Sequence, residues 1–151
     1  MVKRSLILLL AVLAVSSAHA QSAYIGLRLA GANSLDTFAE RLPYLGLQFG
    51  LRVAGPLELR AALDTFLLAS SAHADLLYTQ PLGGGVRGYL GAGPDLYTNV
   101  FVAKTNYGAH ATAGVEYRSG VAGFFAEAQP IYAFSAAALR ARLGLGVNFH
   151  F

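Results

Sequence analysis

Three residues close together in the sequence, Ser71, His73 and Asp75, have the side chains that nucleophilic catalysis uses. A serine nucleophile needs a base within hydrogen-bonding distance and an acidic group that orients this base. In a strand, His73 and Asp75 would point to the same face, and a loop serine could approach them. The surrounding Ser-Ser-Ala-His-Ala-Asp is also ordinary loop composition. We therefore keep Ser71, His73 and Asp75 as candidate catalytic residues, although we expect a protein that is not an enzyme.

Other histidines and acidic residues give no stronger chemical signal. His110, Thr112 and Glu116 would share one face of a strand, but threonine is a poor candidate for the nucleophile there. His73, His110 and His150 fall in separate segments, whereas a zinc site draws its ligands from close spacings. The sequence therefore predicts no metal site and no cofactor.

Most of the remaining charges recur at alternate positions of apolar segments, on a face that they share with many glycines. Glycine weakens strands, so a water-exposed sheet surface has no reason to favour it. The narrow interior of an eight-stranded barrel, by contrast, needs small residues beside long ones. The positive and negative charges are nearly balanced, so we expect them to pair and to plug the interior. The expected charge network of the lumen comprises Arg28, Arg52, Glu58, Arg60, Asp64, Glu116, Glu127, Arg140 and Arg142.

The opposite face of the same segments is apolar. Leu139 to Phe151 alternates strictly between apolar and polar or glycine residues, a period of two that a helix cannot place on two faces. Two further strands, at 73–79 and 86–92, alternate less clearly, and either could be shifted by one residue or contain a bulge. The clearly alternating segments are 24–29, 44–53, 57–64, 107–117, 122–129 and 139–151.

The connections between these segments alternate in length. An outer-membrane barrel whose N-terminus lies in the periplasm has short inner turns and long outer loops. The sequence predicts long connections at 30–43 and 93–106, compact turns at 55–56, 80–85 and 118–120, and intermediate connections at 69–72 and 133–137. The compact turns fall at every second connection, where such a barrel has its periplasmic turns.

The first twenty residues have the layout of a secretory signal peptide. Lys3 and Arg4 precede an apolar run from Leu6 to Val15, and Ala18-His19-Ala20 follows as a cleavage site. The apolar run is about half of the roughly 20 residues that a membrane-spanning helix needs. We therefore expect a signal peptide at 1–20 and one domain at 21–151.

Composition excludes several classes of partner and anchor. Without Lys3 and Arg4 the chain is close to neutral, so its basic isoelectric point does not indicate nucleic-acid binding. The chain has no cysteine, which excludes disulfides and a cysteine-linked lipid anchor.

Over residues 21–151 the pattern resembles the small eight-stranded outer-membrane barrels of the OmpA/OmpX type. The most specific element is the C-terminal series Leu143, Leu145, Val147, Phe149 and Phe151, which resembles the signal read by the barrel-assembly machinery. The resemblance implies delivery by periplasmic chaperones, insertion by that machinery and a barrel surrounded by outer-membrane lipid. Phe149 and Phe151 would also suit the aromatic rim of such a barrel.

The expected fold is thus an all-β, antiparallel, transmembrane up-and-down barrel of about eight strands in the outer membrane of a diderm bacterium. The expected role is structural or surface-interacting, through 30–43 and 93–106, in envelope integrity or adhesion to an unidentified surface ligand. One alternative is a lipid A-modifying enzyme that acts at the outer rim through Ser71, His73 and Asp75. Another is a narrow diffusion channel, which the charged interior disfavours.

Overall fold

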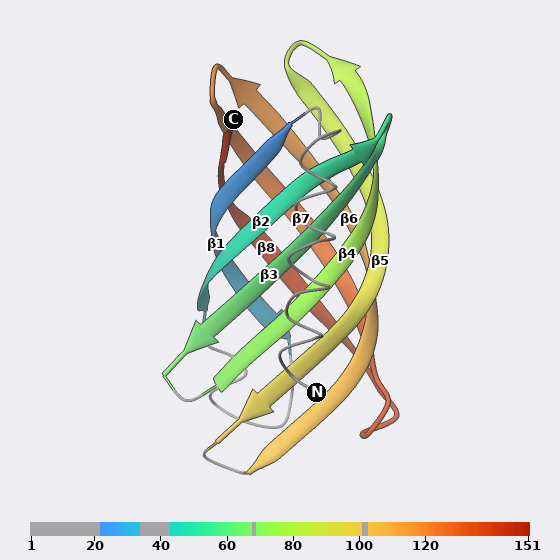
Figure 1. Ribbon diagram of the computed structural model, residues 1–151. Helices are drawn as coiled ribbons and strands as arrows, with labels where there is room; N and C mark the ends of the chain where they lie inside the picture. The colour runs from blue at the N-terminus through green and yellow to red at the C-terminus, as the bar shows by residue number, and fades with distance from the viewer. Residues whose placement is uncertain (1–21, 34–42, 68, 101–102) are drawn as a thin grey trace, which may run out of the picture.

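The computed structural model describes residues 22–33, 43–67, 69–100 and 103–151, which form a closed antiparallel barrel of eight strands. Each strand pairs with the next one in the chain, and β8 pairs with β1 to close the barrel (Figure 1). The predicted all-β, up-and-down architecture is confirmed. The predicted signal peptide and most of the 30–43 connection lie outside the described residues. The strands are β1 (Ala23–Asn33), β2 (Tyr44–Ala54), β3 (Leu57–Phe66), β4 (Ala69–Gly83), β5 (Val86–Asn99), β6 (Lys104–Ser119), β7 (Ala122–Ala133) and β8 (Ala138–His150).

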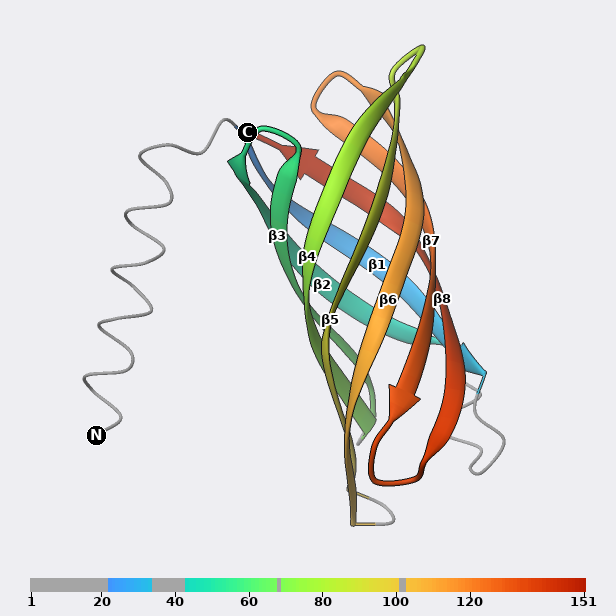
Figure 2. The same cartoon turned by 90° about the vertical axis from the view of Figure 1, so that its right-hand side faces the viewer.

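The two ends of the barrel differ in their connections. Compact turns at 55–56, 84–85 and 120–121 lie at one end, together with both ends of the described chain (Figures 1 and 2). Gly55 and Gly120 have φ values of +51° and +61°, in the left-handed region that glycine adopts without steric cost. We call this end the turn end, and the opposite one, with connections 34–43, 67–68, 100–103 and 134–137, the loop end. The compact turns thus occupy every second connection and lie together at one end, as predicted.

Strands β4 and β5 are longer than the sequence pattern predicts. The connections expected at 69–72 and 93–106 are wrong, because most of these residues belong to strands and β5 is joined to β6 by 100–103 alone. Gly93-Pro94 resembles a turn signal, but a Cβ on Gly93 would lie 1.7 Å from the carbonyl oxygen of Ala74 on the neighbouring strand. Glycine is therefore needed here for close approach of two strands, and not for a loop.

The uncertain alternation in β4 has a simple structural cause. Leu77 points inward and is buried, whereas Leu76 points outward, so an apolar residue occupies a lumen position without any shift of register. The β4–β5 register is interrupted only between Pro81 and Gly83, next to the turn. A second irregularity lies between Arg52 and Ala54 in β2.

Alternation along every strand separates an apolar outer face from a polar interior. Leu145 is 57 % exposed and Leu47 is 55 % exposed, whereas Arg142 is 4 % exposed and Glu116 is fully buried. A water-soluble protein has the opposite arrangement, with large apolar residues inside. This inverted distribution is the one that a lipid-facing barrel requires.

The described residues contain no helix that is long and apolar enough to span a bilayer.

Glycines on the inner face make room for aromatic rings inside the narrow barrel. Gly50 lies directly opposite Tyr24 on the neighbouring strand, and a Cβ at Gly50 would lie 2.1 Å from Cζ of the tyrosine ring. Gly114 stands in the same relation to Tyr89, with a distance of 2.4 Å. The observed contacts support the expectation that small residues of the polar face offset large ones.

We therefore expect Gly50→Ala to destabilise the barrel by about 1–3 kcal/mol, because the added methyl group must displace a packed ring. Gly31→Ala is the matched control: no atom lies within 4 Å of its added Cβ, and loss of glycine entropy in the unfolded chain should stabilise by about 0.4–1 kcal/mol. Urea unfolding in lipid vesicles measures both changes. Equal effects of the two substitutions would show that the lumen is not tightly packed at Tyr24.

Candidate functional site

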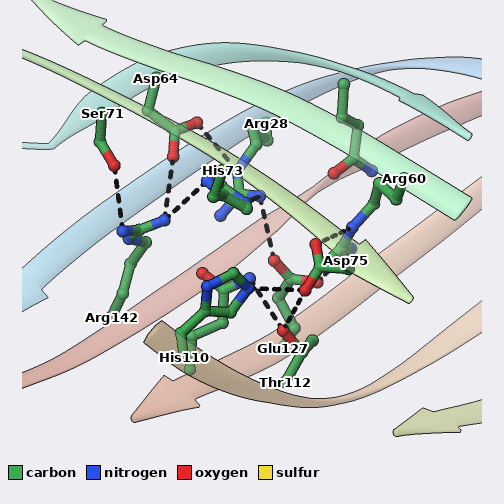
Figure 3. A network of polar contacts seen from close by, with 12 residues as sticks. Arg28, Arg60, Asp64, Ser71, His73, Asp75, His110, Thr112, Glu127 and Arg142 are labelled. Atoms are coloured by element: carbon green, nitrogen blue, oxygen red, sulfur yellow. Dashed lines mark hydrogen bonds and ion pairs between the residues drawn. The ribbon is translucent and has the colours of Figure 1, made fainter. Parts of the chain in front are cut away.

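The centre of the lumen is a buried cluster of ion pairs, and all of them except Arg60–Asp75 join strands that are not neighbours (Figure 3). Glu127 of β7 bridges two arginines: its Oε1 lies 3.1 Å from Nη1 of Arg28 and its Oε2 lies 2.5 Å from Nη1 of Arg60. Arg28 also contacts Asp64, with 3.0 Å between Nε and Oδ1, and Arg60 contacts Asp75, with 3.0 Å between Nε and Oδ2. Each charge therefore has an opposite charge in contact, as a buried charge requires.

A second group of polar contacts lies toward the loop end, around Arg142 of β8. Nη2 of Arg142 donates to Asp95 and, at 3.0 Å, to Oγ of Ser71. Nη1 lies 2.8 Å from Nδ1 of His73 and 3.8 Å from Oδ2 of Asp64. Arg142 thus cross-links β8 to three strands on other sides of the barrel.

A third group lies toward the turn end, around Glu116. Its Oε1 accepts from Nε of Arg87 at 3.0 Å and from Nε of Arg118 at 3.1 Å, and it lies 3.0 Å from Nε2 of His150. Nη1 of Arg87 donates to Oε2 of Glu58 at 2.8 Å. The polar contacts therefore extend along the barrel from the loop end to the turn end.

The structure brings Ser71, His73 and Asp75 to one face but engages each with other partners. Ser71 lies in β4 and not in a loop, and its hydroxyl accepts from Arg142. Both ring nitrogens of His73 face guanidinium groups, Nδ1 that of Arg142 and Nε2 that of Arg28. A neutral imidazole has only one acceptor nitrogen, so its lone pair is directed at an arginine and is not available to the serine.

Asp75 does not orient His73. Its Oδ1 accepts from Thr112 at 2.7 Å and lies 2.7 Å from Nε2 of His110, while Oδ2 binds Arg60. The three candidate residues therefore form no relay of nucleophile, base and acid. Among the described residues, no group of histidine and acidic side chains has the arrangement of a metal site.

Arg52, which the sequence placed in the paired charge network of the lumen, forms no pair with Glu58. The two residues face each other in the β2–β3 register, but Glu58 is occupied by Arg87 and by the Tyr24 hydroxyl, which donates at 2.7 Å. Arg52 lies at the turn end, where β2 becomes irregular, and makes no ion pair with any residue that the structure describes. Arg140 is also only partly buried, at the loop end. Both arginines thus belong to the mouths of the barrel and not to its centre.

Sequence reasoning missed Arg87 and Asp95 as lumen charges. Asp95 lay within the segment expected to be a loop, so its alternation was not considered. Arg87 lies directly opposite Glu116 in the β5–β6 register, and a search for opposite charges across neighbouring strands would have found this pair.

The predicted assembly signal occupies the outer face of β8 at the seam with β1. Leu143, Leu145, Phe149 and Phe151 are exposed, and Val147 is partly covered. The backbone N–H of Phe151 donates to the carbonyl of Ala23 at 2.9 Å, and Ala23 donates back at 3.0 Å. The last residue therefore contributes to barrel closure through its backbone as well as through its ring.

Solved structures with the same architecture are transmembrane barrels. A transmembrane β-barrel designed de novo is similar over 86 % of this chain and 95 % of its own, with a TM-score of 0.63 and 11 % identity. Neisserial surface protein A (NspA) gives a TM-score of 0.56 with 16 % identity, over 86 % of this chain and 96 % of its own. Ail, the attachment invasion locus protein of Yersinia pestis, was solved in complex with the heparin analogue sucrose octasulfate. It gives a TM-score of 0.50 with 13 % identity, over 86 % of this chain and 97 % of its own.

No protein-family model matches the chain, and no curated protein does so either. The structural comparisons therefore concern the fold alone. They confirm the expected likeness: this chain has the architecture of the small outer-membrane β-barrels with eight strands.

Proposed function

We propose that this protein is an integral outer-membrane barrel with a lumen closed by ion pairs, which acts at the cell surface as a non-enzymatic interaction or envelope protein. The observation that carries the proposal is the inverted barrel: large apolar side chains face outward while paired charges fill the interior. The fold of the two bacterial neighbours, a surface protein and an attachment protein by name, supports the location and the role.

Aromatic residues on the outer face support a membrane position. Tyr78 and Tyr117 lie near the turn end, and Tyr107, Tyr132 and Phe134 lie near the loop end, all of them exposed. Two such girdles mark the membrane interfaces of outer-membrane barrels. The strand positions described between them carry no outward-facing charge.

The lumen contacts argue against a diffusion channel. Beneath the loop end lies a cavity of about 40 Å³, lined among others by Asp64, Asp95 and Arg142, which holds no more than a few water molecules. The central ion pairs lie below it. Planar bilayers containing the refolded protein should show no steady conductance, and a stable open level would contradict the closed lumen.

Location is tested by expression in a diderm host. The mature protein should begin at Gln21, fractionate with the outer membrane and migrate anomalously on gels unless boiled, because a closed barrel has no free edge at which unfolding can begin. A soluble periplasmic product would contradict the proposal.

The surface role is tested separately with a loop variant. Cells that display the protein should bind immobilised host-cell matrix more strongly than cells in which 34–42 is replaced by glycine and serine. Equal binding would contradict a surface contact through this segment, and sensitivity of the same cells to detergent then measures the envelope role.

Lipid A should have the same mass with and without the protein, since His73 and Ser71 are both engaged by arginines.

If the assembly machinery recognises the ring of Phe151, loss of this ring should impair insertion more than it impairs stability. Phe151→Ala keeps the backbone bonds with Ala23, whereas deletion of Phe151 removes them, so the substitution isolates the ring. We expect Phe151→Ala to reduce insertion in cells strongly and to change unfolding of barrels already folded in detergent little. Pulse-labelling in cells measures the rate of insertion, and unfolding in detergent measures the stability of the folded barrel. Equal losses of insertion and of stability would leave only an interface role for the ring.

A further inference from the structure

Three arginines gather at the turn-end mouth of the lumen. Arg52, Arg87 and Arg118 line a cavity of about 500 Å³, together with residues of the β2–β3 turn and of the β4–β5 hairpin. The β4–β5 hairpin, which projects at this end in Figure 2, forms one wall. The β2–β3 turn is tied to the same wall, since Thr79 donates its backbone N–H to the carbonyl of Pro56 at 2.8 Å.

The charges of this mouth are not balanced. Arg87 is shared between Glu58 and Glu116, and Arg118 donates its Nε to Glu116, so both acidic residues are already engaged. Nη2 of Arg118 lies 2.5 Å from Nδ1 of His150. Arg52 therefore adds a positive charge that forms no ion pair with a side-chain carboxylate of the described residues.

Arg52 also differs from the other arginines in having no partner among the described residues: buried nitrogens of Arg28 and Arg60 lack a hydrogen bond as well, but both of those side chains form ion pairs. Nε of Arg52 is buried and has no partner among the described residues. Leaving a buried charged donor unsatisfied is costly in a folded protein. Every other arginine in the described part of the chain has a hydrogen-bond or electrostatic partner. An anion in the cavity would balance the positive charge of Arg52.

We propose that the turn-end mouth binds a small oxyanion, a phosphate or a carboxylate, between Arg52 and Arg118. Planar guanidinium groups match both kinds of anion with paired hydrogen bonds. Nε and Nη2 of Arg118 are occupied, whereas Nη1 has no partner within the described ranges, and the side chain is 31 % exposed. The arginines line the interior and not the apolar outer face, so the anion arrives from the aqueous compartment at this end, and not as a lipid headgroup.

The test uses the refolded full barrel in a maltoside detergent, since a phosphocholine detergent would itself supply the anion. Calorimetric titrations with inorganic phosphate and with citrate, at constant ionic strength in chloride, distinguish the two chemistries. Saturable binding of at least one is expected. Arg52→Gln should weaken it by about tenfold or more, which corresponds to the loss of one charge-assisted hydrogen-bonded contact.

Arg140→Gln, at the loop end, is the matched control and should bind as the unmodified protein does. Arg52→Lys keeps the charge but not the planar fork, so an intermediate affinity is expected. Gel migration without boiling verifies that each variant is folded. The proposal is overturned if neither anion saturates, if Arg52→Gln binds equally well, or if Arg140→Gln weakens binding as much as Arg52→Gln does.

Discussion

Replacing Arg142 with leucine should destabilise the barrel by about 3–5 kcal/mol, because it removes one partner of a buried ion pair. Asp95 has Arg142 as its ion-pair partner among the described residues and is itself buried, so the substitution leaves this carboxylate alone inside the lumen. Ser71 and His73 lose a donor at the same time. Urea unfolding in lipid vesicles measures the change.

Arg52→Leu provides the matched control for this prediction. Arg52 occupies the same inner face but has no ion pair with the described residues, so its loss should not destabilise the barrel by more than about 1 kcal/mol. A second control, Asp95→Asn combined with Arg142→Leu, should recover part of the loss because no uncompensated charge remains. If Arg142→Leu is neutral or stabilising, the paired lumen is the wrong description.

Leu145→Arg should destabilise the barrel by about 2–4 kcal/mol for a different reason, since it places a charge against lipid near the middle of the membrane. Leu145 lies midway along β8, is 57 % exposed and is paired with Leu29 and Ala126 on the adjacent strands. The folding equilibrium in vesicles, measured by tyrosine fluorescence, reports the effect.

The cost of an outward arginine should depend on depth. Leu139, at the loop-end start of the same strand, is more exposed than Leu145, and Leu139→Arg should cost only about 0–1 kcal/mol because the side chain can reach the interface. A soluble barrel would tolerate both substitutions equally. Equal and small effects at the two positions would therefore contradict the membrane assignment.

The strand pattern was predictable because one physical rule acts along the whole chain. Each inward residue must fit a narrow interior, and each outward residue must be compatible with lipid. Because successive residues of a strand point to opposite faces, these two requirements impose a period of two. Leu139 to His150 follows the rule and forms β8 with nearly the expected bounds. Gly93-Pro94 and Ser70-Ser71 were misread as loop because their composition is typical of turns, although both lie within paired strands.

The partners inside the lumen were harder to predict. Arg28 and Arg60 meet Glu127 across the barrel, and Arg142 meets Asp95 in the same way. Such contacts depend on the tilt and stagger of the strands, which the period of two does not specify. The alternation indicated most of the charges that lie inside, although not Arg87 and Asp95, whereas three-dimensional closure decided which of them pair and left Arg52 without an ion pair among the described residues.

The absence of cysteine from the chain allows a direct measurement of which face meets lipid. Single cysteines at Ala126 and Ala128, on the outer face of β7, carry a small fluorophore in vesicles with brominated lipid, and a single cysteine at Gln129, on the inner face, is left unlabelled. We predict strong quenching at 126 and 128, and a thiol at 129 that resists aqueous reagents until the barrel unfolds. Weak quenching at 126 and 128, or rapid aqueous labelling of the thiol at 129 in the folded barrel, would contradict a lipid-facing barrel with a closed polar interior.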